Sequence, residues 1–268
     1  MEIAGYIAII IAGISIGLIG AGRGILTVPI LVYLFAVNPV LATAYSLFVV
    51  GTTSLAGTVP KYKNGNVSLR MVVVFGIPSM VSIFLVRKFV LPQLPKIIFE
   101  VESFQVSRSM FLMLFFAVLM IFASYSTLKK RRKTSNLSSE TTEIQPFFVS
   151  LLGFIEGAIT GLVGAGGGFI IIPILMIFAR LDIKKAIGTS LLIIGIKSVI
   201  GFSGDIISAH FDIDWLFLIK ITLVCIFGMF IGNALSKKID GSRLQKGFGW
   251  FILIMGIYIL IKEVFFRE

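Results

Sequence analysis

Long apolar stretches alternate with short polar ones along the whole chain. In the first half the apolar runs cover 3–20, 25–37, 40–59, 69–86 and 109–128. In the second half they cover 147–163, 169–179, 186–204, 213–235 and 248–261. Several runs approach the ~20 residues that an α-helix needs to cross a bilayer. We therefore predict an all-α integral membrane protein, a multi-span helical bundle of about 8–10 apolar segments.

Two of these runs, 25–37 and 169–179, are too short to cross a bilayer as ordinary helices. A helix adds ~1.5 Å per residue, so even the longer of the two reaches only ~20 Å, whereas the hydrocarbon core is ~30 Å thick. We expect these runs to be half-helices or strongly supported short spans.

A glycine-rich break precedes each short run. The first break consists of Gly20, Ala21, Gly22, Arg23 and Gly24, and the second of Gly164, Ala165, Gly166, Gly167 and Gly168. Glycine lets the backbone leave a helix, and a helix that restarts after the break points free N–H groups and its positive dipole end at the glycines. Paired broken helices in corresponding halves of a chain are typical of a transporter's substrate site. We therefore predict that both breaks bind an anionic substrate.

The two halves carry an internal duplication with an offset of 144 residues. Sixteen of the forty-five positions in 13–57 are identical 144 residues later, and the matches include seven glycines, one proline and two serines. Chance can match leucine and isoleucine in apolar sequence, but it does not readily match this set in register. Such self-similarity indicates repeated units. We expect residues 1–128 to form one membrane repeat, 129–146 a linker, and 147–268 the second repeat.

Composition and charge change the picture only in detail. The chain of 268 residues is 57% hydrophobic and 14% charged, with a mean hydropathy of +1.03. Its net charge of +11 does not indicate nucleic-acid binding, because the cations lie in short loops between the apolar runs. The N-terminus lacks the basic region and cleavage site of a signal peptide, so we expect run 3–20 to be a retained first helix.

The distribution of positive charge predicts the topology. Five adjacent cations at 129–133 place the linker 129–146 in the cytoplasm, because positive loops remain inside. If each apolar run crosses the membrane once, counting crossings in both directions from the linker places loop 61–70 in the cytoplasm as well and both chain ends outside the cell. Each half has five runs, so the repeats face opposite ways, as an inverted repeat in the cell (plasma) membrane. The basic segment 87–108, read as a polar connection, would then be external, against the charge rule.

Three ionisable residues lie inside apolar surroundings, where charge is costly and tends to serve function. Arg23 could hold an oxyanion together with the amides of Gly22 and Gly24; the alternatives are snorkelling or pairing with Glu156. Lys197, in the middle of its run, is expected to face a cavity or Glu156. Glu156 is a candidate for proton coupling, because burial raises a carboxylate's pKa, and a structural partnership is an equal alternative.

We further predict that Glu156 and Lys197 lie close together. Both belong to the second half, and eight residues of helix put Glu156 ~12 Å from the second break. Two opposite charges inside a bilayer are costly apart and tolerable together.

Hydroxyl groups add to the candidate substrate site. Ser46, Ser190 and Ser198 are candidates to hydrogen-bond a substrate, with bonds between helices as the slightly favoured alternative. The glycine clusters lack the spacing of a dinucleotide site, and there is no Walker A lysine. We therefore expect neither an enzyme nor a cofactor, and no metal site, because His210 is the only histidine.

These motifs also carry a resemblance to a known family. The chain resembles the sulfite exporter TauE/SafE family of membrane transporters in both glycine breaks and in the Pro-Ile-Leu that follows each. The stretches 188–192, 198–201 and 210–215 fit as well, and the resemblance covers nearly the whole chain outside 87–108 and the linker. It implies transport of sulfite, sulfonates and related organic anions. Arg23 and Lys197 depart from the family's pattern, in which glycine and a neutral polar residue are usual.

The hypothesis is a secondary transporter, and an exporter, of a small anion such as sulfite or a sulfonate. The anion would bind near the midplane between two glycine-broken helix N-termini. Its partners would be the substrate, the lipid bilayer and a coupling proton or other ion, but not nucleic acid; assembly into a homo-oligomer is one alternative. The rival hypotheses are an anion channel with the same site and a membrane scaffold that transports nothing.

Overall fold

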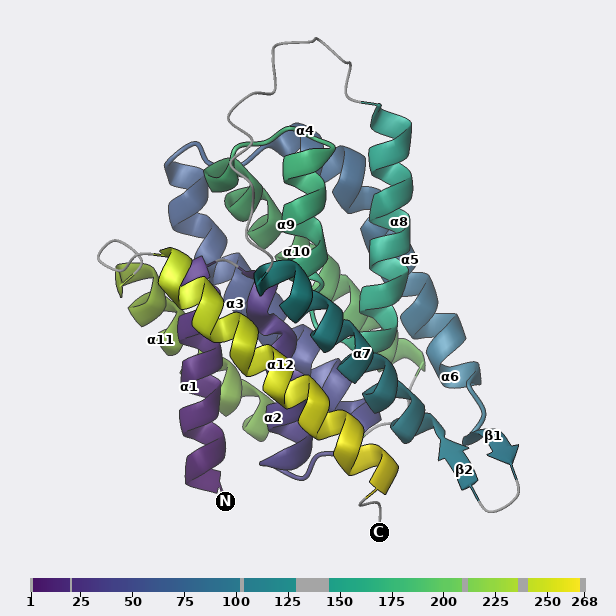
Figure 1. Ribbon diagram of the computed structural model, residues 1–268. Coiled ribbons are helices and arrows are strands. Elements are labelled where there is room, and N and C mark those ends of the chain that lie inside the picture. Colours follow the sequence, from purple (N-terminus) through teal and green to yellow (C-terminus); the bar gives the residue numbers. More distant parts are fainter. Residues whose placement is uncertain are drawn as a thin grey trace.

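A bundle of helices makes up nearly all of the computed structural model (Figure 1), which describes residues 2–19, 21–101, 104–128, 145–208, 212–235 and 241–265. The first half contains α1 (Glu2–Ile19), η1 (Ala21–Leu26), α2 (Thr27–Tyr33), α3 (Pro39–Lys63), α4 (Leu69–Met71), η2 (Val72–Gly76), α5 (Ile77–Leu85), η3 (Val86–Val90), α6 (Leu91–Gln93) and α7 (Arg108–Leu128). The second half contains α8 (Pro146–Val163), α9 (Gly168–Ile177), α10 (Ile183–Ser208), α11 (Trp215–Leu235) and α12 (Gly241–Phe265). Most of the linker, 129–144, lies outside the described residues.

The prediction of a multi-span helical membrane protein is confirmed. Six helical segments in the described part of the chain are long and apolar enough to cross a membrane: Pro39–Lys63, Leu69–Gln93, Arg108–Tyr125, Pro146–Val163, Ile183–Ile207 and Trp215–Leu235. Shorter apolar helices cover Ile3–Leu18, Gly24–Tyr33 and Gly168–Ile177. The last two of these correspond to the runs that are too short to span.

Helices α3 and α10 form the centre of the bundle. They are 72% and 67% buried, whereas the other four candidate spans are 39–44% buried. The contacts of their glycines show where the two helices cross. A Cβ atom placed on Gly51 would meet Ser198 and Val199, and one placed on Gly195 would meet Leu55. Since the contacts run in opposite directions along the two chains, α3 and α10 are antiparallel.

Each outer helix packs against a helix of the other half. Helix α1 packs along α11, α8 packs along η2 and α5, and α7 packs along α12. Glycine permits the closest approaches, because a Cβ at Gly13 would strike the carbonyl oxygen of Cys225, and one at Gly157 would strike that of Ser79. Small residues that let helix backbones touch are typical of packing inside membranes. Gly13 and Gly157 are 144 residues apart, so the duplicated glycines make equivalent contacts.

Side-chain caps begin the two central helices at equivalent positions. The Asn38 side chain accepts a hydrogen bond from the amide of Val40, at 3.0 Å. At the corresponding place in the second half, Asp182 accepts from the amides of Lys184 and Lys185. Such caps satisfy amides that have no partner within the helix.

The segment 87–108 differs from its prediction as a polar connection. The helix that begins at Leu69 continues to Gln93, and Arg87 and Leu91 are buried in it. The reading was wrong because Arg87 has a buried acidic partner, which neighbouring sequence does not reveal. The rest forms an antiparallel hairpin of β1 (Ile97–Val101) and β2 (Phe104–Ser107), a small departure from an all-α fold.

The ends of the elements lie at two opposite ends of the bundle (Figure 1). The start of α1, the end of α12 and the β-hairpin lie at one end, at the bottom of the view, and α8 begins at the other. The second glycine break is therefore reached from one end by α8 and the first break from the opposite end by α1.

Candidate functional site

The second glycine break is a sharp turn between α8 and α9. Helix α8 ends at Val163, and Gly164 takes a left-handed conformation, with φ of 73°. Gly166 and Gly167 are also left-handed, each with φ of 70°. Residues with side chains rarely adopt this conformation, so these positions favour glycine. Helix α9 begins at Gly168, and its first-turn amides face back toward the break.

Each glycine of this break contacts a different part of the bundle. A Cβ at Gly164 would lie 2.5 Å from the carbonyl oxygen of Thr43 in α3. One at Gly166 would lie 2.8 Å from Val50 and 3.3 Å from Ile194. The break therefore packs between α3 and α10, and Ala165 in the middle of it is buried.

Gly167 lies directly against a buried polar cluster. A Cβ at this position would strike Oε1 of Glu156 and Oγ1 of Thr160, and it would lie 3.0 Å from Nζ of Lys197. Only glycine leaves room here for the carboxylate to reach the start of α9. The positive end of a helix dipole stabilises a negative charge at such a place.

Glu156 and Lys197 form a buried ion pair through Oε1 and Nζ, with 1% and 0% of their side chains exposed. The same Oε1 accepts a hydrogen bond from Thr160 at 2.6 Å, and Oε2 accepts one from Ser79 at 2.8 Å. Lys197 also donates to Thr160 at 3.3 Å. Both carboxylate oxygens are thus satisfied away from water, as a buried charge requires.

The predicted proximity of Glu156 and Lys197 is confirmed, whereas Thr160 and Ser79 were missed. Thr160 follows Glu156 by four residues on α8, so helical spacing was a usable signal for it. Ser79 comes from α5 in the other half, and only the packing of α8 on α5 brings it near.

The cluster has no counterpart in the first half. Subtracting 144 from Glu156 and Lys197 gives Ala12 and Thr53, both completely buried. The equivalent positions of the first half therefore pack in this fold without charged side chains. Helix packing by itself does not require the Glu156–Lys197 pair.

The first break is formed by η1, which contacts both α9 and α10. A Cβ at Gly24 would lie 2.7 Å from Val50, the residue that also contacts Gly166 of the other break. Gly20 lies outside the described residues, and only the backbone is described for Ala21, Gly22 and Arg23. A role for Arg23 in binding an anion stays a prediction.

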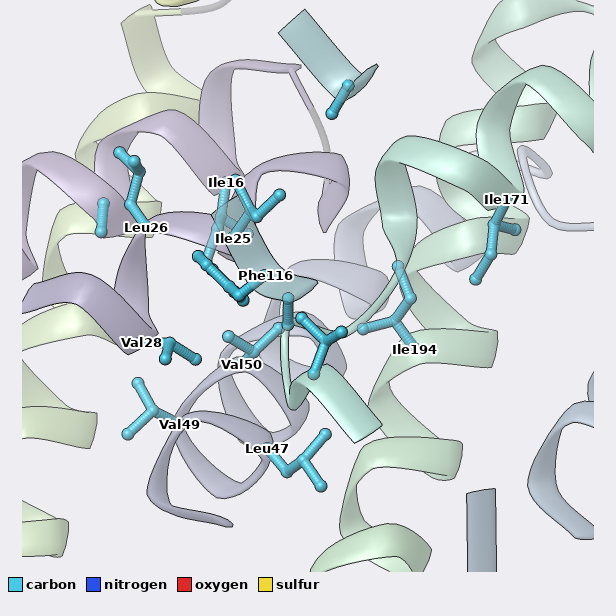
Figure 2. Close-up of a cluster of buried hydrophobic side chains, with 14 of the residues drawn as sticks. Ile16, Ile25, Leu26, Val28, Leu47, Val49, Val50, Phe116, Ile171 and Ile194 are labelled. Carbon is cyan, nitrogen blue, oxygen red and sulfur yellow. The ribbon is translucent and has the colours of Figure 1, made fainter. Parts of the chain in front are cut away.

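Apolar side chains separate the two breaks. Figure 2 shows Val50 and Ile194 among buried residues that include Ile25 and Ile171. Val50 and Ile194 are 144 residues apart, and both are completely buried. In this conformation the space between the breaks is therefore filled.

The three serines of the predicted site differ in their bonding. Ser190 donates to the carbonyl oxygen of Ile187 in its own helix, at 2.9 Å. The hydroxyls of Ser46 and Ser198 are buried and have no hydrogen-bond partner within the described part of the protein. Buried hydroxyls without a partner are costly, so Ser46 and Ser198 are available to a polar ligand.

A second buried ion pair lies near the end of the bundle that holds the hairpin. Nη1 of Arg87, in η3, donates to Oδ2 of Asp205 at 3.1 Å and to Oγ1 of Thr43 at 3.0 Å. The sequence analysis placed Arg87 in a polar connection, and it left Asp205 in the connection that follows the run 186–204. In the structure both residues lie within apolar helices. Each charge comes directly after the end of a predicted apolar run, and this position was the only sequence signal that the helices continue further.

Among the described residues, no group of three His, Cys, Asp or Glu side chains is placed to hold a metal ion.

Comparisons with known proteins place this geometry in context. A family model described as Sulfite exporter TauE/SafE matches residues 6–259. A probable membrane transporter protein of Xylella fastidiosa is 26% identical over 94% of this chain and 92% of its own length. The probable membrane transporter protein YunE of Bacillus subtilis is 26% identical over 96% of both chains. No solved structure matches the chain.

Proposed function

Because the chain belongs to the sulfite exporter TauE/SafE family of membrane proteins, we propose that it is a secondary transporter that exports a small anion. The proposed substrates are sulfite, a sulfonate or a related sulfur oxyanion. The proposed site lies at the second glycine break, with the first break as its partner across Val50 and Ile194.

One observation carries this proposal: the buried Glu156–Lys197 pair lies against Gly167, at the start of α9. Ionisable residues inside a membrane are costly and mark substrate or ion pathways. Here the equivalent places in the other half hold Ala12 and Thr53, so packing alone does not explain the pair. The nearby amides of α9 and the hydroxyl of Ser198 add donors suited to an oxyanion.

Charge balance suggests how this pair would couple an anion to a proton. With Glu156 ionised, its charge and that of Lys197 cancel. When a proton neutralises Glu156, Lys197 is left with an uncompensated positive charge, and a monovalent anion restores neutrality. An empty pair and a pair loaded with one proton and one anion therefore have the same net charge, and both are tolerable inside a bilayer.

The direct test is flux into proteoliposomes that contain the purified protein. Sulfite, sulfate, thiosulfate, sulfoacetate, taurine and carboxylates are compared, each with and without a pH gradient. We expect saturable flux of one or more sulfur anions that an imposed pH gradient accelerates. Unsaturable flux that ignores the gradient would favour a channel, and a complete absence of flux would favour a scaffold.

A matched control comes from the protein itself. The double variant Glu156→Ala, Lys197→Thr copies the residues of the first half at the equivalent positions. It removes both charges together, so it leaves no unpaired charge in the membrane. We expect it to fold and to lose pH-driven flux; unchanged coupled flux would move the site elsewhere.

A further inference from the structure

The ammonium group of Lys197 lies against oxygen atoms that belong to another helix. Its Nζ pairs with Oε1 of Glu156 and donates to Oγ1 of Thr160 at 3.3 Å, and the side chain of Lys197 is fully buried. Glu156 and Thr160 are four residues apart, so they lie on one face of α8. Carboxylate and hydroxyl oxygens are hard ligands of the kind that bind hard metal cations in proteins. We call these three side chains the ammonium site.

The end of α8 also favours a positive charge at this place. Thr160 lies in the last turn of the helix, which ends at Val163. The last carbonyl groups of a helix have no donor within it, and they form the negative end of its dipole. In the broken helices of transporters, such ends help to coordinate coupling cations. Lys197 therefore places its ammonium group where a free cation would also be attracted.

The single carboxylate of the site sets the charge of the cation that fits. Ser79 donates to Oε2 of Glu156, and Thr160 donates to Oε1, so hydroxyl groups stabilise the carboxylate without cancelling its charge. One positive charge beside Glu156 makes the site neutral, as Lys197 does now. A divalent cation would leave a net positive charge inside the bilayer, which is costly. The site therefore suits a monovalent cation.

The equivalent place in the first half has neither the oxygen ligands nor the ammonium group. The positions 144 residues before the three side chains of the ammonium site hold Ala12, Ile16 and Thr53, and all three are buried. The cation and its two oxygen ligands therefore occur together in one half and are replaced together in the other. This is expected if the three side chains act as one unit. Thr53 also shows that the fold accommodates a threonine at this position.

We propose that the ammonium group of Lys197 occupies a site for a small monovalent cation, so that the chain supplies this cation from its own sequence. The site itself does not depend on the transport function, but its consequence for coupling rests on that proposed function. A transporter that already holds the positive charge needs no free metal cation, so anion flux by the unchanged protein should not require Na⁺. Removing the amine of Lys197 should turn the ammonium site into a binding site for Na⁺.

Thermal unfolding of Lys197→Thr in detergent tests the site on the purified full chain. This variant copies Thr53 and vacates the space of the ammonium group, while Glu156 and Thr160 remain. The unpaired carboxylate should bind Na⁺ in the folded state, which stabilises that state by mass action. We expect the melting temperature to rise by roughly 5 °C or more when NaCl replaces choline chloride at constant ionic strength. Choline is too large for this space, and the unchanged protein should show no comparable rise.

Two matched variants check that Na⁺ binds at the ammonium site. The double variant Glu156→Ala, Lys197→Thr vacates the same space but lacks the carboxylate, so it should respond to NaCl no more than the unchanged protein. Thr160→Val, added to Lys197→Thr, removes one hydroxyl ligand at nearly constant volume. It should raise the Na⁺ concentration needed for half of the stabilisation roughly tenfold, the scale of a lost polar contact to a charged group.

Two results would overturn the proposal. The first is a folded Lys197→Thr protein whose melting temperature is the same in NaCl and in choline chloride. The second is an equal response to Na⁺ in Lys197→Thr and in the double variant without the carboxylate, because the ion would then bind elsewhere.

Rescue by a free amine keeps the proposal testable if Lys197→Thr does not fold. Lys197→Ala is purified in parallel in choline chloride, in NaCl and in methylammonium chloride, whose cation replaces the missing amine. We expect Na⁺ or methylammonium to recover folded protein where choline does not. Failure of both cations to recover Lys197→Ala, together with an unfolded Lys197→Thr, would also count against the site.

Unfolding and flux separate this proposal from the transport function. In proteoliposomes, anion flux by Lys197→Thr should require Na⁺, because Na⁺ restores the positive charge that balances the anion. Stabilisation by Na⁺ in a chain that transports none of the tested anions would uphold the cation site and reject the transporter. Anion flux by the unchanged protein, with no response of Lys197→Thr to Na⁺, would uphold the transporter and reject the cation site.

Discussion

At the scale of single residues, the buried Glu156–Lys197 pair gives the sharpest expectation. Ser79 and Thr160 satisfy the carboxylate, so removing one charge leaves the other buried without its main partner. We expect Glu156→Ala alone to lower the free energy of unfolding by about 3–5 kcal/mol, the usual cost of breaking a buried pair. Thermal unfolding in detergent measures the effect.

The double variant Glu156→Ala, Lys197→Thr is the control for that measurement. It should be more stable than Glu156→Ala, because a neutral pair carries no desolvation cost. If the double variant loses as much stability as the two single variants together, the two side chains are not energetically coupled, despite their contact.

Arg23 gives a second expectation at this scale. Its position in the first glycine break motivates a charge-assisted bond to the anion. We expect Arg23→Ala to weaken anion binding by about 1–3 kcal/mol, measured by calorimetry with the best transported anion. Arg23→Lys keeps the charge but loses the bidentate geometry, so its affinity for the anion should lie between those of the unchanged protein and Arg23→Ala. Equal affinity in all three folded proteins would assign Arg23 to structure.

At the scale of elements, glycine contacts hold the two halves together. The backbone of Gly157 in α8 lies against the carbonyl oxygen of Ser79 in α5, and an added methyl group has no room. We expect Gly157→Ala to separate these helices and to lower the melting temperature by several degrees, since overpacking costs about 1–3 kcal/mol.

Gly247 provides the matched control, because a Cβ there would meet nothing within 4 Å. Gly247→Ala should leave stability equal or slightly higher, since alanine favours helix more than glycine does. A Gly157→Ala protein as stable as the Gly247→Ala protein would contradict the close packing of α8 on α5.

At the scale of the whole molecule, the arrangement supports an inverted repeat, which remains a prediction. The equivalent helices α3 and α10 are antiparallel, and each half's first helix packs on a helix of the other half. In an inverted repeat the hairpin 97–107 and the linker 129–146 lie on opposite sides of the membrane. Helix α7, with 21 residues, spans ~30 Å between them.

Site-directed labelling checks this topology. In a Cys225→Ala background, we expect Gln105→Cys to react with an impermeant thiol reagent on intact cells, whereas Ser138→Cys in the linker reacts only after permeabilisation. Labelling of both positions from the same side would rule out the inverted arrangement.

The sequence alone determined the class of protein, located the two glycine-rich segments and predicted the pairing of Glu156 with Lys197. These features follow from local patterns: apolar run length, glycine placement, and the rule that a charge inside a membrane needs a partner. Repetition at 144 residues also revealed which positions are equivalent.

The tertiary structure alone decided which residues complete each buried ion pair. Ser79 reaches Glu156 across 77 residues of sequence, and Arg87 reaches Asp205 across 118. Such contacts depend on how helices from different halves pack side by side, and no local pattern encodes that register. The same packing places the Arg87–Asp205 pair inside the bundle, whereas the sequence placed both residues in connections between apolar runs.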